Sequence, residues 1–403
     1  MLRKVAVRLL PALFLCAVTG CWSRTELNDI AITLAIGLDK KGDQYMISTQ
    51  MVNPSEVAAK KGGGGKGAPV VTFSETGDTV FEAFRKITTK APRRLYFSHL
   101  RMLIISEPLA KEGIAKALDL LLRNHEFRSD FYIVIARGLS AQKVLEIYTM
   151  PQELIPANNI YKTLQHSSKS WATAGKVTLD ELINDITAEG KHPALTGIDV
   201  LDDPSGEQAG TQKNAASIKP ISVLRVSGLA VFYKDRLKGW LNEQESKAYN
   251  YIKGNVKNTV DTVACPKGGK LSVEVIRTKS EIIGKIPNGK PEVSVELYVE
   301  GNVADVECNI DLTQTDTIDE LEKRMETEIK DHMKAAIHKA QKTYRSDIFG
   351  FGEAIHRADP KVWNRLKDHW VQEFVDLPVN LRIHVKLRRV GTINKPFFKQ
   401  LEE

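Results

Sequence analysis

Histidine and carboxylate side chains that could act as acids, bases or metal ligands are scattered through this 403-residue chain. His125 stands beside Glu126, and His332, His338 and His356 follow much later in the sequence. His332 and His338 are six residues apart, which places them on different faces of a helix, so a shared metal ion is not expected. Because no acid, base and nucleophile have the spacing of a catalytic motif, the sequence predicts no enzyme, no metal site and no cofactor.

A glycine-rich run, KKGGGGKG at residues 60–67, has the composition of a phosphate-binding loop. In such loops the lysine is followed by Ser or Thr, whereas here Gly67 follows Lys66. A phosphate-binding loop also follows a strand and leads into a helix, and the sequence around this run clearly predicts neither. A flexible, solvated loop is therefore the favoured interpretation.

Cys21 has the strongest chemical signal in the sequence. Three basic residues precede an apolar stretch over residues 9–18, which is the layout of a signal peptide covering residues 1–20. The stretch ends in Val-Thr-Gly-Cys at residues 18–21, which resembles the lipobox of bacterial lipoproteins. That motif implies that the Cys21 thiol receives a diacylglyceryl group and that its new amino terminus is acylated. An ordinary signal peptide whose cleavage site happens to adjoin a cysteine is the alternative, and Cys16 would be discarded in either case.

The expected anchor is sufficient to hold the chain at a membrane, because two or more acyl chains bind far more durably than one. No run of 18 apolar residues follows Cys21, so we expect no membrane-spanning segment in the rest of the chain. The whole sequence has a net charge of +7, and loss of Arg3, Lys4 and Arg8 leaves +4. This is too weakly basic to indicate nucleic-acid binding. We therefore expect an exported protein, lipid-anchored to the outer face of the bacterial cell membrane.

The two remaining cysteines, Cys265 and Cys308, lie 43 residues apart and fit no metal motif. A disulfide between them is permitted in a compartment outside the cytosol, and it would contribute about 3–4 kcal/mol in the chain-entropy model. Two separately buried free thiols are the alternative. The sequence favours the free thiols, because the hairpin expected in this region does not place the two cysteines opposite each other.

Residues 21–205 are predicted to form an α/β region, open to division into two subdomains near residue 150. Apolar residues alternate over residues 30–38 and again over 44–52, which predicts a hairpin. Further strands are expected at 95–106, 131–136 and 195–201, with helices at 78–90, from Pro108 to Leu122, and after Ser140. Residues 151–190 are predicted to be mostly helical, with a capping box at Thr178 and Glu181.

Residues 206–219 contain few large apolar side chains and are predicted to link this region to a C-terminal α/β domain at 220–403. Strands at 221–233 and 237–241 should open that domain, and Asn288–Gly289 should close a long hairpin. A capping box at Thr317 and Glu320 predicts a long amphipathic helix that ends near Tyr344. The final strand, 381–388, should have one solvent-exposed, basic face formed by Arg382, Lys386 and Arg388. The predicted fold class is mixed α/β (α+β), multi-domain, with helices packed on mixed sheets.

Four segments of the chain resemble a known family. They are GCWSRTELNDIAITLAIGLDK at 20–40, LYFSHLRMLIISEPLA at 95–110, GLAVFYKDRLKGWLNEQE at 228–245 and SDIFGFGEAIHR at 346–357. Together they resemble the Ger(x)C spore-germination lipoproteins. The resemblance implies the C subunit of a GerA-type germinant receptor, accompanied by A and B subunits embedded in the inner membrane of the spore. It implies no enzymatic activity, and Cys21 is the one functional residue that it transfers.

A solute-binding lipoprotein of a transport system is the second hypothesis. Such a protein would also be anchored at Cys21 and would hold an amino acid or sugar between two α/β lobes. Its chain usually crosses between the lobes more than once, whereas this sequence has one convincing boundary, at residues 206–219. The germination hypothesis is therefore preferred.

Overall fold

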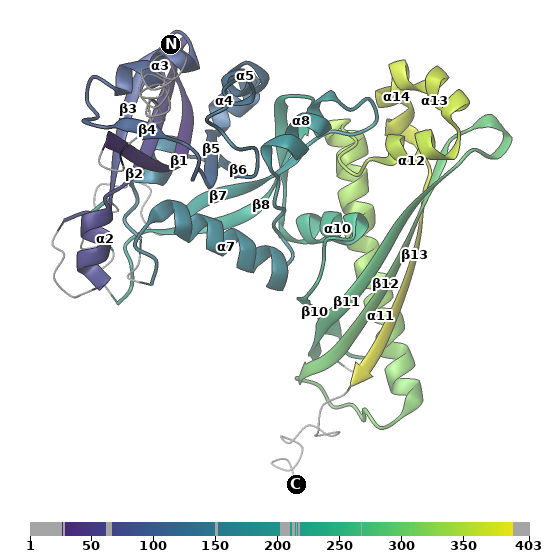
Figure 1. Cartoon of the computed structure of the whole chain (residues 1–403). Helices are drawn as coiled ribbons and strands as arrows, with labels where there is room; N and C mark the ends of the chain where they lie inside the picture. The colour runs from purple at the N-terminus through teal and green to yellow at the C-terminus, as the bar shows by residue number, and fades with distance from the viewer. Residues whose placement is uncertain are drawn as a thin grey trace, which may run out of the picture.

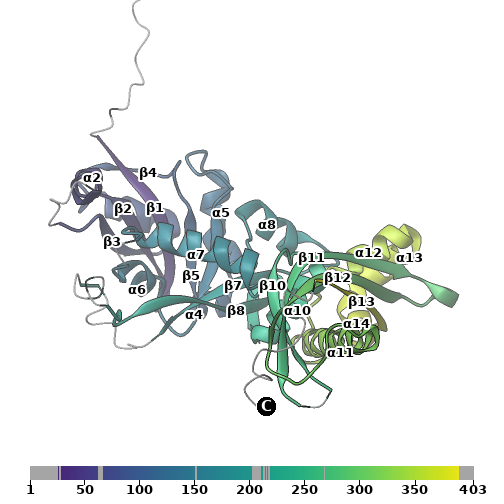
Figure 2. The same cartoon turned by 90° about the horizontal axis from the view of Figure 1, so that it is seen from below.

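The computed structural model describes residues 26, 29–61, 67–149, 152–201, 210–211, 214, 216, 218–266 and 268–389. Two β-sheets lie in separate halves of the molecule, and helices pack on both of them (Figure 1, Figure 2). Within these ranges, no helix combines the length and the apolar character needed to cross a bilayer. The α+β class predicted from the sequence is confirmed.

The first sheet has nine strands, with a parallel centre and antiparallel sides. Its spatial order is β3 (Val70–Gly77), β2 (Gln44–Val52), β1 (Ile30–Lys41), β5 (Met102–Ser106), β6 (Tyr132–Ala136), β7 (Ala194–Leu201), β8 (Val223–Tyr233) and β9 (Arg236–Leu241). A short strand, β4 (Arg94–Tyr96), pairs with the start of β1. The predicted hairpin of β1 and β2 is confirmed.

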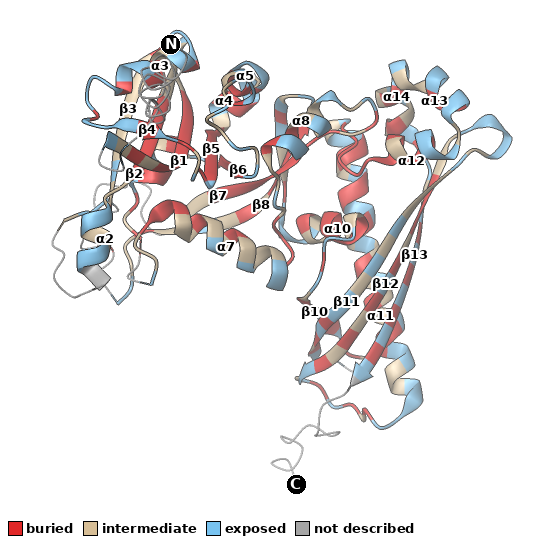
Figure 3. Cartoon of the chain, viewed as in Figure 1, coloured by how far each residue is buried: buried red, intermediate tan, exposed pale blue. Residues whose placement is uncertain are grey.

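Helices cover both faces of the first sheet, because its central strands are apolar on both sides. One face is covered by α3 (Val80–Ile87), α4 (Glu107–Glu112), α5 (Ala115–Arg123) and α8 (Leu179–Thr187). The other is covered by α6 (Ala141–Glu146) and α7 (Pro156–Ser170), and α2 (Pro54–Lys61) follows β2. The buried residues concentrate in the strands and on the inner sides of these helices (Figure 3).

Two predicted elements of this half are broken in the structure. The strand expected at 95–106 is divided into β4 and β5 by a turn in which the Leu100 N–H donates to the Phe97 carbonyl. Both pieces still pair with β1, one after the other. The helix expected from Pro108 is divided into α4 and α5 at Gly113, whose φ of 133° does not fit a helix.

The second sheet has four strands, β10 (Thr259–Ala264), β11 (Lys270–Lys285), β12 (Glu292–Val306) and β13 (Val379–Arg389). Strands β11 and β12 form the predicted hairpin, and Asn288 and Gly289 at its tip have the positive φ angles that suit this pair. Strand β13 runs parallel to β12 at the edge. Helix α10 (Glu243–Lys253) connects the two sheets (Figure 1).

The long helix α11 (Thr315–His338) packs its apolar stripe on the second sheet. The predicted capping box is wrong, because the helix begins two residues before Thr317, with Gln314 as its N-cap. A π-helical turn (Lys339–Tyr344) extends it to the residue where the sequence placed its end. Three short helices follow, α12 (Phe351–Ala358), α13 (Pro360–Leu366) and α14 (Trp370–Asp376), with a 3-10 turn (Lys367–His369) between the last two.

The strand pairing does not divide at the predicted linker. Strands β8 and β9, which the sequence placed in the C-terminal domain, extend the first sheet, because β8 pairs antiparallel with β7. A polar, turn-rich segment predicts a loop but cannot tell whether the strands on either side of it pair with each other. The second sheet begins only after α10.

Candidate functional site: the junction of the two sheets

The residues that could do chemistry by sequence are not brought together. Cys21, Cys16 and most of the glycine-rich run lie outside the described residues. In the part of the chain that the structure describes, no three His, Cys, Asp or Glu side chains could share a metal ion. His125 is exposed in the turn after α5, and His338 is exposed at the end of α11. The His356 ring stacks on Trp363. Glu126 forms an ion pair with Arg94.

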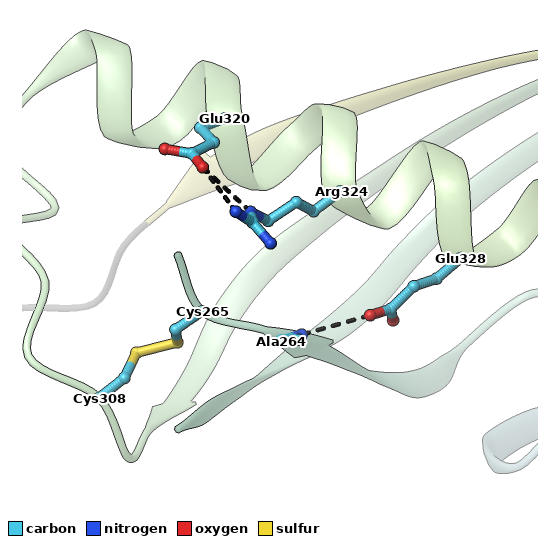
Figure 4. The surroundings of a disulfide bond; sticks show 6 residues. All are labelled: Ala264, Cys265, Cys308, Glu320, Arg324 and Glu328. Atoms are coloured by element: carbon cyan, nitrogen blue, oxygen red, sulfur yellow. Dashed lines mark hydrogen bonds and ion pairs between the residues drawn. A yellow bond between two sulfur atoms is a disulfide. The ribbon is translucent and has the colours of Figure 1, made fainter. Parts of the chain in front are cut away.

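Cys265 and Cys308 are joined by a disulfide, with their Cα atoms 6.4 Å apart (Figure 4). The sequence favoured two free thiols, because the hairpin expected in this region does not place the two cysteines opposite each other. The structure brings them together just beyond the ends of β10 and β12, where the Glu307 N–H donates to the Lys270 carbonyl. On the neighbouring helix α11, Glu328 accepts the backbone N–H of Ala264 at 3.3 Å. The bond therefore closes the end of the second sheet at which β10 and β12 end, opposite the tip of the β11–β12 hairpin.

The two sheets meet around the junction loop, residues 345–352, and Asp347 lies at its centre. Oδ1 of Asp347 accepts three backbone N–H groups, from residues 349–351, at 2.9–3.1 Å. Oδ2 accepts the Gly352 N–H at 2.8 Å and the Trp370 indole N–H at 3.0 Å. Burial raises the pKa of this carboxyl to about 6, although the N–H donors favour its ionised form. Asp347 thus fixes the start of α12 and ties it to α14.

The junction loop is also bonded to the first sheet. The His192 N–H donates to the Asp347 carbonyl at 2.8 Å. The Ser346 hydroxyl donates to the carbonyl of Phe232, a residue of β8. Because both acceptors and donors are buried, these bonds exclude water and would be costly to leave unmade.

Two close contacts complete the attachment. The Tyr344 hydroxyl donates to the Trp240 carbonyl at 2.8 Å and accepts the Trp240 N–H at 3.0 Å. Gly190 packs directly on Gly352, and a Cβ atom added to Gly352 would lie 2.6 Å from the Gly190 Cα. Only glycine permits the two backbones to approach so closely at this point.

Charged side chains at the junction are held in a shielded environment. Lys191 pairs with Asp185 at 2.5 Å, and Lys253 donates to the Phe349 carbonyl at 3.0 Å. Burial raises the pKa of Asp185, and burial together with the charge of Lys191 lowers the pKa of Lys253. Lys191, Asp185 and Lys253 are therefore bonded to partners inside the junction.

A cavity of about 380 Å³ lies beside the junction and is lined by both halves of the molecule. The His192 ring packs against the Tyr233 ring, with centroids 4.7 Å apart and the ring planes inclined by 40°. Among the described residues its Nδ1 has no hydrogen-bond partner. Burial, with a smaller contribution from the charge of Lys234, lowers the pKa of His192 to about 4, so the ring is neutral at neutral pH. The Glu189–Lys367 ion pair spans the cavity at 3.1 Å. The lining can contact a small polar molecule but offers no base hydrogen-bonded to a nucleophile.

Sequence reasoning did not single out Asp347, His192 or the glycine pair. One signal was present, since SDIFGFGEAIHR places an aspartate directly before alternating Phe and Gly residues after a long helix. An Asp before glycines often accepts successive backbone N–H groups. His192 and Gly190 carried no such signal, because their partners lie about 160 residues away in the sequence.

Two family models together match most of the chain. A family model described as "Spore germination protein N-terminal domain" matches residues 23–200, and one described as "Spore germination B3/ GerAC like, C-terminal" matches residues 227–391. Spore germination protein KC of Bacillus subtilis (strain 168) is 31% identical, over 100% of both chains. Spore germination protein B3 of the same organism is 22% identical, over 94% of this chain and 96% of the relative.

A solved structure has the same fold. The crystal structure of the GerBC protein matches with a TM-score of 0.53 and 19% identity, over 87% of this chain and 96% of that one. The relative that is 31% identical over its full length establishes the family as well as the fold. The chain belongs to the Ger(x)C family of spore germination proteins.

Proposed function

We propose that this chain is the lipid-anchored C subunit of a nutrient germinant receptor. In this proposal it is attached through Cys21 to the outer face of the inner membrane of the spore, where it assembles with the A and B subunits. The observation that carries the proposal is full-length similarity to several spore germination proteins, combined with a lipobox cysteine at position 21. A lipid on Cys21 would hold at the membrane a chain whose described part has no helix suited to cross it.

The proposed role is assembly or support of the receptor, without catalysis. The most heavily bonded carboxylate among the described residues, Asp347, uses both oxygens to hold backbone N–H groups. A carboxylate so engaged is a poor general base, since proton transfer would break the loop that it organises. A rigid connection between two sheets suits a subunit that must present surfaces on both halves to its partners.

The test is affinity purification of the lipidated chain from detergent-solubilised membranes of the spore former. The proposal predicts that a chain tagged after residue 403 brings down the A and B subunits, and that a tagged unrelated spore lipoprotein does not. Recovery of a transport permease in place of the A and B subunits would support the solute-binding alternative and contradict the proposal.

A further inference from the structure

One end of the first sheet carries aromatic and basic side chains that the junction does not use. We name this group the aromatic–basic patch, and it consists of Phe81, Arg85, Arg93, Arg94, Tyr96 and Leu122. The three apolar members are exposed by 47% (Phe81), 37% (Tyr96) and 49% (Leu122). Phe81, Arg85 and Arg94 line one cavity of about 170 Å³. Tyr96 and Leu122 lie on β4 and α5, the elements that contribute Leu95 and Leu120 to the same cavity. Large apolar side chains gathered on a surface indicate contact with a partner or a membrane.

The patch is basic because no Asp or Glu occurs between Glu82 and Glu107. Carboxylates from outside that interval neutralise part of its charge, and one of these pairs joins Arg94 to Glu126. The positive charge of Arg85 contributes to the patch, and its guanidinium lies 4.9 Å from the centroid of the Phe81 ring. Arg93 is exposed and makes no ion pair or side-chain hydrogen bond within the described ranges. Cations beside exposed rings are the composition that the headgroup region of a bilayer accommodates.

The chain length places this patch near the proposed anchor. In the first sheet, Arg94 of β4 is the register partner of Ile30 at the start of β1. Ile30 follows Cys21 by nine residues in the sequence. Even fully extended, that connection spans at most about 30 Å. This limit places Ile30, the register partner of Arg94, within about 30 Å of the proposed lipid-bearing residue.

We propose that the aromatic–basic patch rests against anionic phospholipid headgroups of the leaflet that holds the lipid. The inference rests on the proposed lipid attachment at Cys21 and adds to it the face that the protein turns toward the membrane. Arg85 and Arg93 contact lipid phosphates, and Phe81 and Leu122 enter the boundary between headgroups and acyl chains. The second sheet, in the other half of the molecule, is left free for protein partners (Figure 2).

The test measures how fast a bulky, membrane-impermeant maleimide labels a single added thiol. The reporter variant is Arg93→Cys, and the matched control is Lys279→Cys, on the exposed face of β11. Both are made in the full lipidated chain, where Cys265 and Cys308 are joined and do not react. Each variant is compared in detergent, in neutral phosphatidylcholine vesicles and in vesicles that also contain phosphatidylglycerol.

The inference predicts that Arg93→Cys is labelled more slowly in anionic vesicles than in detergent, by about fivefold for each basic contact made with the surface. Lys279→Cys should be labelled equally in all three conditions. If vesicle-bound Arg93→Cys is labelled as fast as the same variant in detergent, the inference is overturned while the anchor stays intact. An equal slowdown in neutral and anionic vesicles would overturn the role of headgroup charge. Protein that does not stay on the vesicles would instead overturn the lipid attachment.

Discussion

At the scale of single residues, the junction depends on polar groups that are buried with their partners. Asp347 is 1% exposed and accepts five N–H groups, which offset part of the cost of burying its carboxylate. His192 is 4% exposed and contributes its backbone N–H to the same loop. Substitutions at these two positions should therefore affect stability more than a charge on the surface would.

Asp347→Asn should lower the free energy of unfolding by about 2–4 kcal/mol. The amide has one acceptor oxygen, and its NH2 group would face N–H donors that the carboxylate now satisfies. Urea-induced unfolding of the two proteins at neutral pH measures the difference. The matched control is Asp331→Asn, an exposed carboxylate paired only with Lys334, which should change stability little. Equal losses in the two variants would contradict the role given to Asp347.

His192 should make the fold sensitive to acid. Its pKa is lowered to about 4 in the folded state, so the neutral ring contributes stability that is complete above the unfolded pKa of about 6.5. That stability is lost as the pH falls from about 6.5 to about 4, and the loss is about 2 kcal/mol at about pH 5. Asp347 titrates in an overlapping range with the opposite sign, because its pKa is raised, and stability from its protonated form is lost as the pH rises toward 6.

A His192→Gln variant separates the two effects, since Asp347 is common to both proteins. Urea midpoints are compared at about pH 7.5 and about pH 5. Wild-type protein should lose more stability between these conditions than the variant does. The same loss in both proteins would show that His192 is not held in its neutral form.

At the scale of elements, the architecture depends on close contact between segments that are distant in the sequence. Gly352→Ala should weaken the attachment of α12 to the first half, because the added methyl group would overlap the Gly190 backbone. Protease digestion of the junction loop should become faster, and thermal stability should fall. Gly175→Ala is the control, since its added methyl group would lie 3.9 Å from the nearest atom. Equal tolerance of both changes would contradict the close packing.

The disulfide can be tested by comparing Cys265→Ser, Cys308→Ser and the double variant. If the cysteines are bonded, all three changes remove the same cross-link and should each cost about 3–4 kcal/mol by the chain-entropy model. If the thiols were free, the two single losses would add in the double variant. Urea unfolding without reductant distinguishes the two results.

Local patterns predicted elements well where the determining information was local. Alternation gave the β1–β2 hairpin and the β11–β12 hairpin, and the Thr178–Glu181 capping box forms as expected. The same rule failed at Thr317, because α11 already begins at Thr315, two residues before the expected N-cap. The assignment of β8 and β9 to the first sheet, and the cysteine pairing, depend on contacts that periodicity does not encode.

At the scale of the whole molecule, the junction loop bonds the second half of the chain to the first sheet, and the chain enters the first sheet shortly after the proposed lipid. Bonds from His192 and Phe232 to the junction loop, and from Trp240 to the preceding Tyr344, make independent motion of the halves costly. A lipid at one end and a rigid connection through the centre would hold the second sheet at a fixed orientation to the membrane. That arrangement fits a subunit whose task is to support membrane-embedded partners.

The most direct test of this account is to replace Cys21 with Ala in the spore former and to compare it with a Cys16→Ala strain. Cys16 lies in the same predicted signal peptide but outside the lipobox, so its loss should change nothing. The measurement is membrane fractionation of the protein together with the germination response to nutrients. We predict that Cys21→Ala abolishes or sharply reduces both membrane attachment and germination. A Cys21→Ala protein that stays with the membrane in spores that germinate normally would contradict the account.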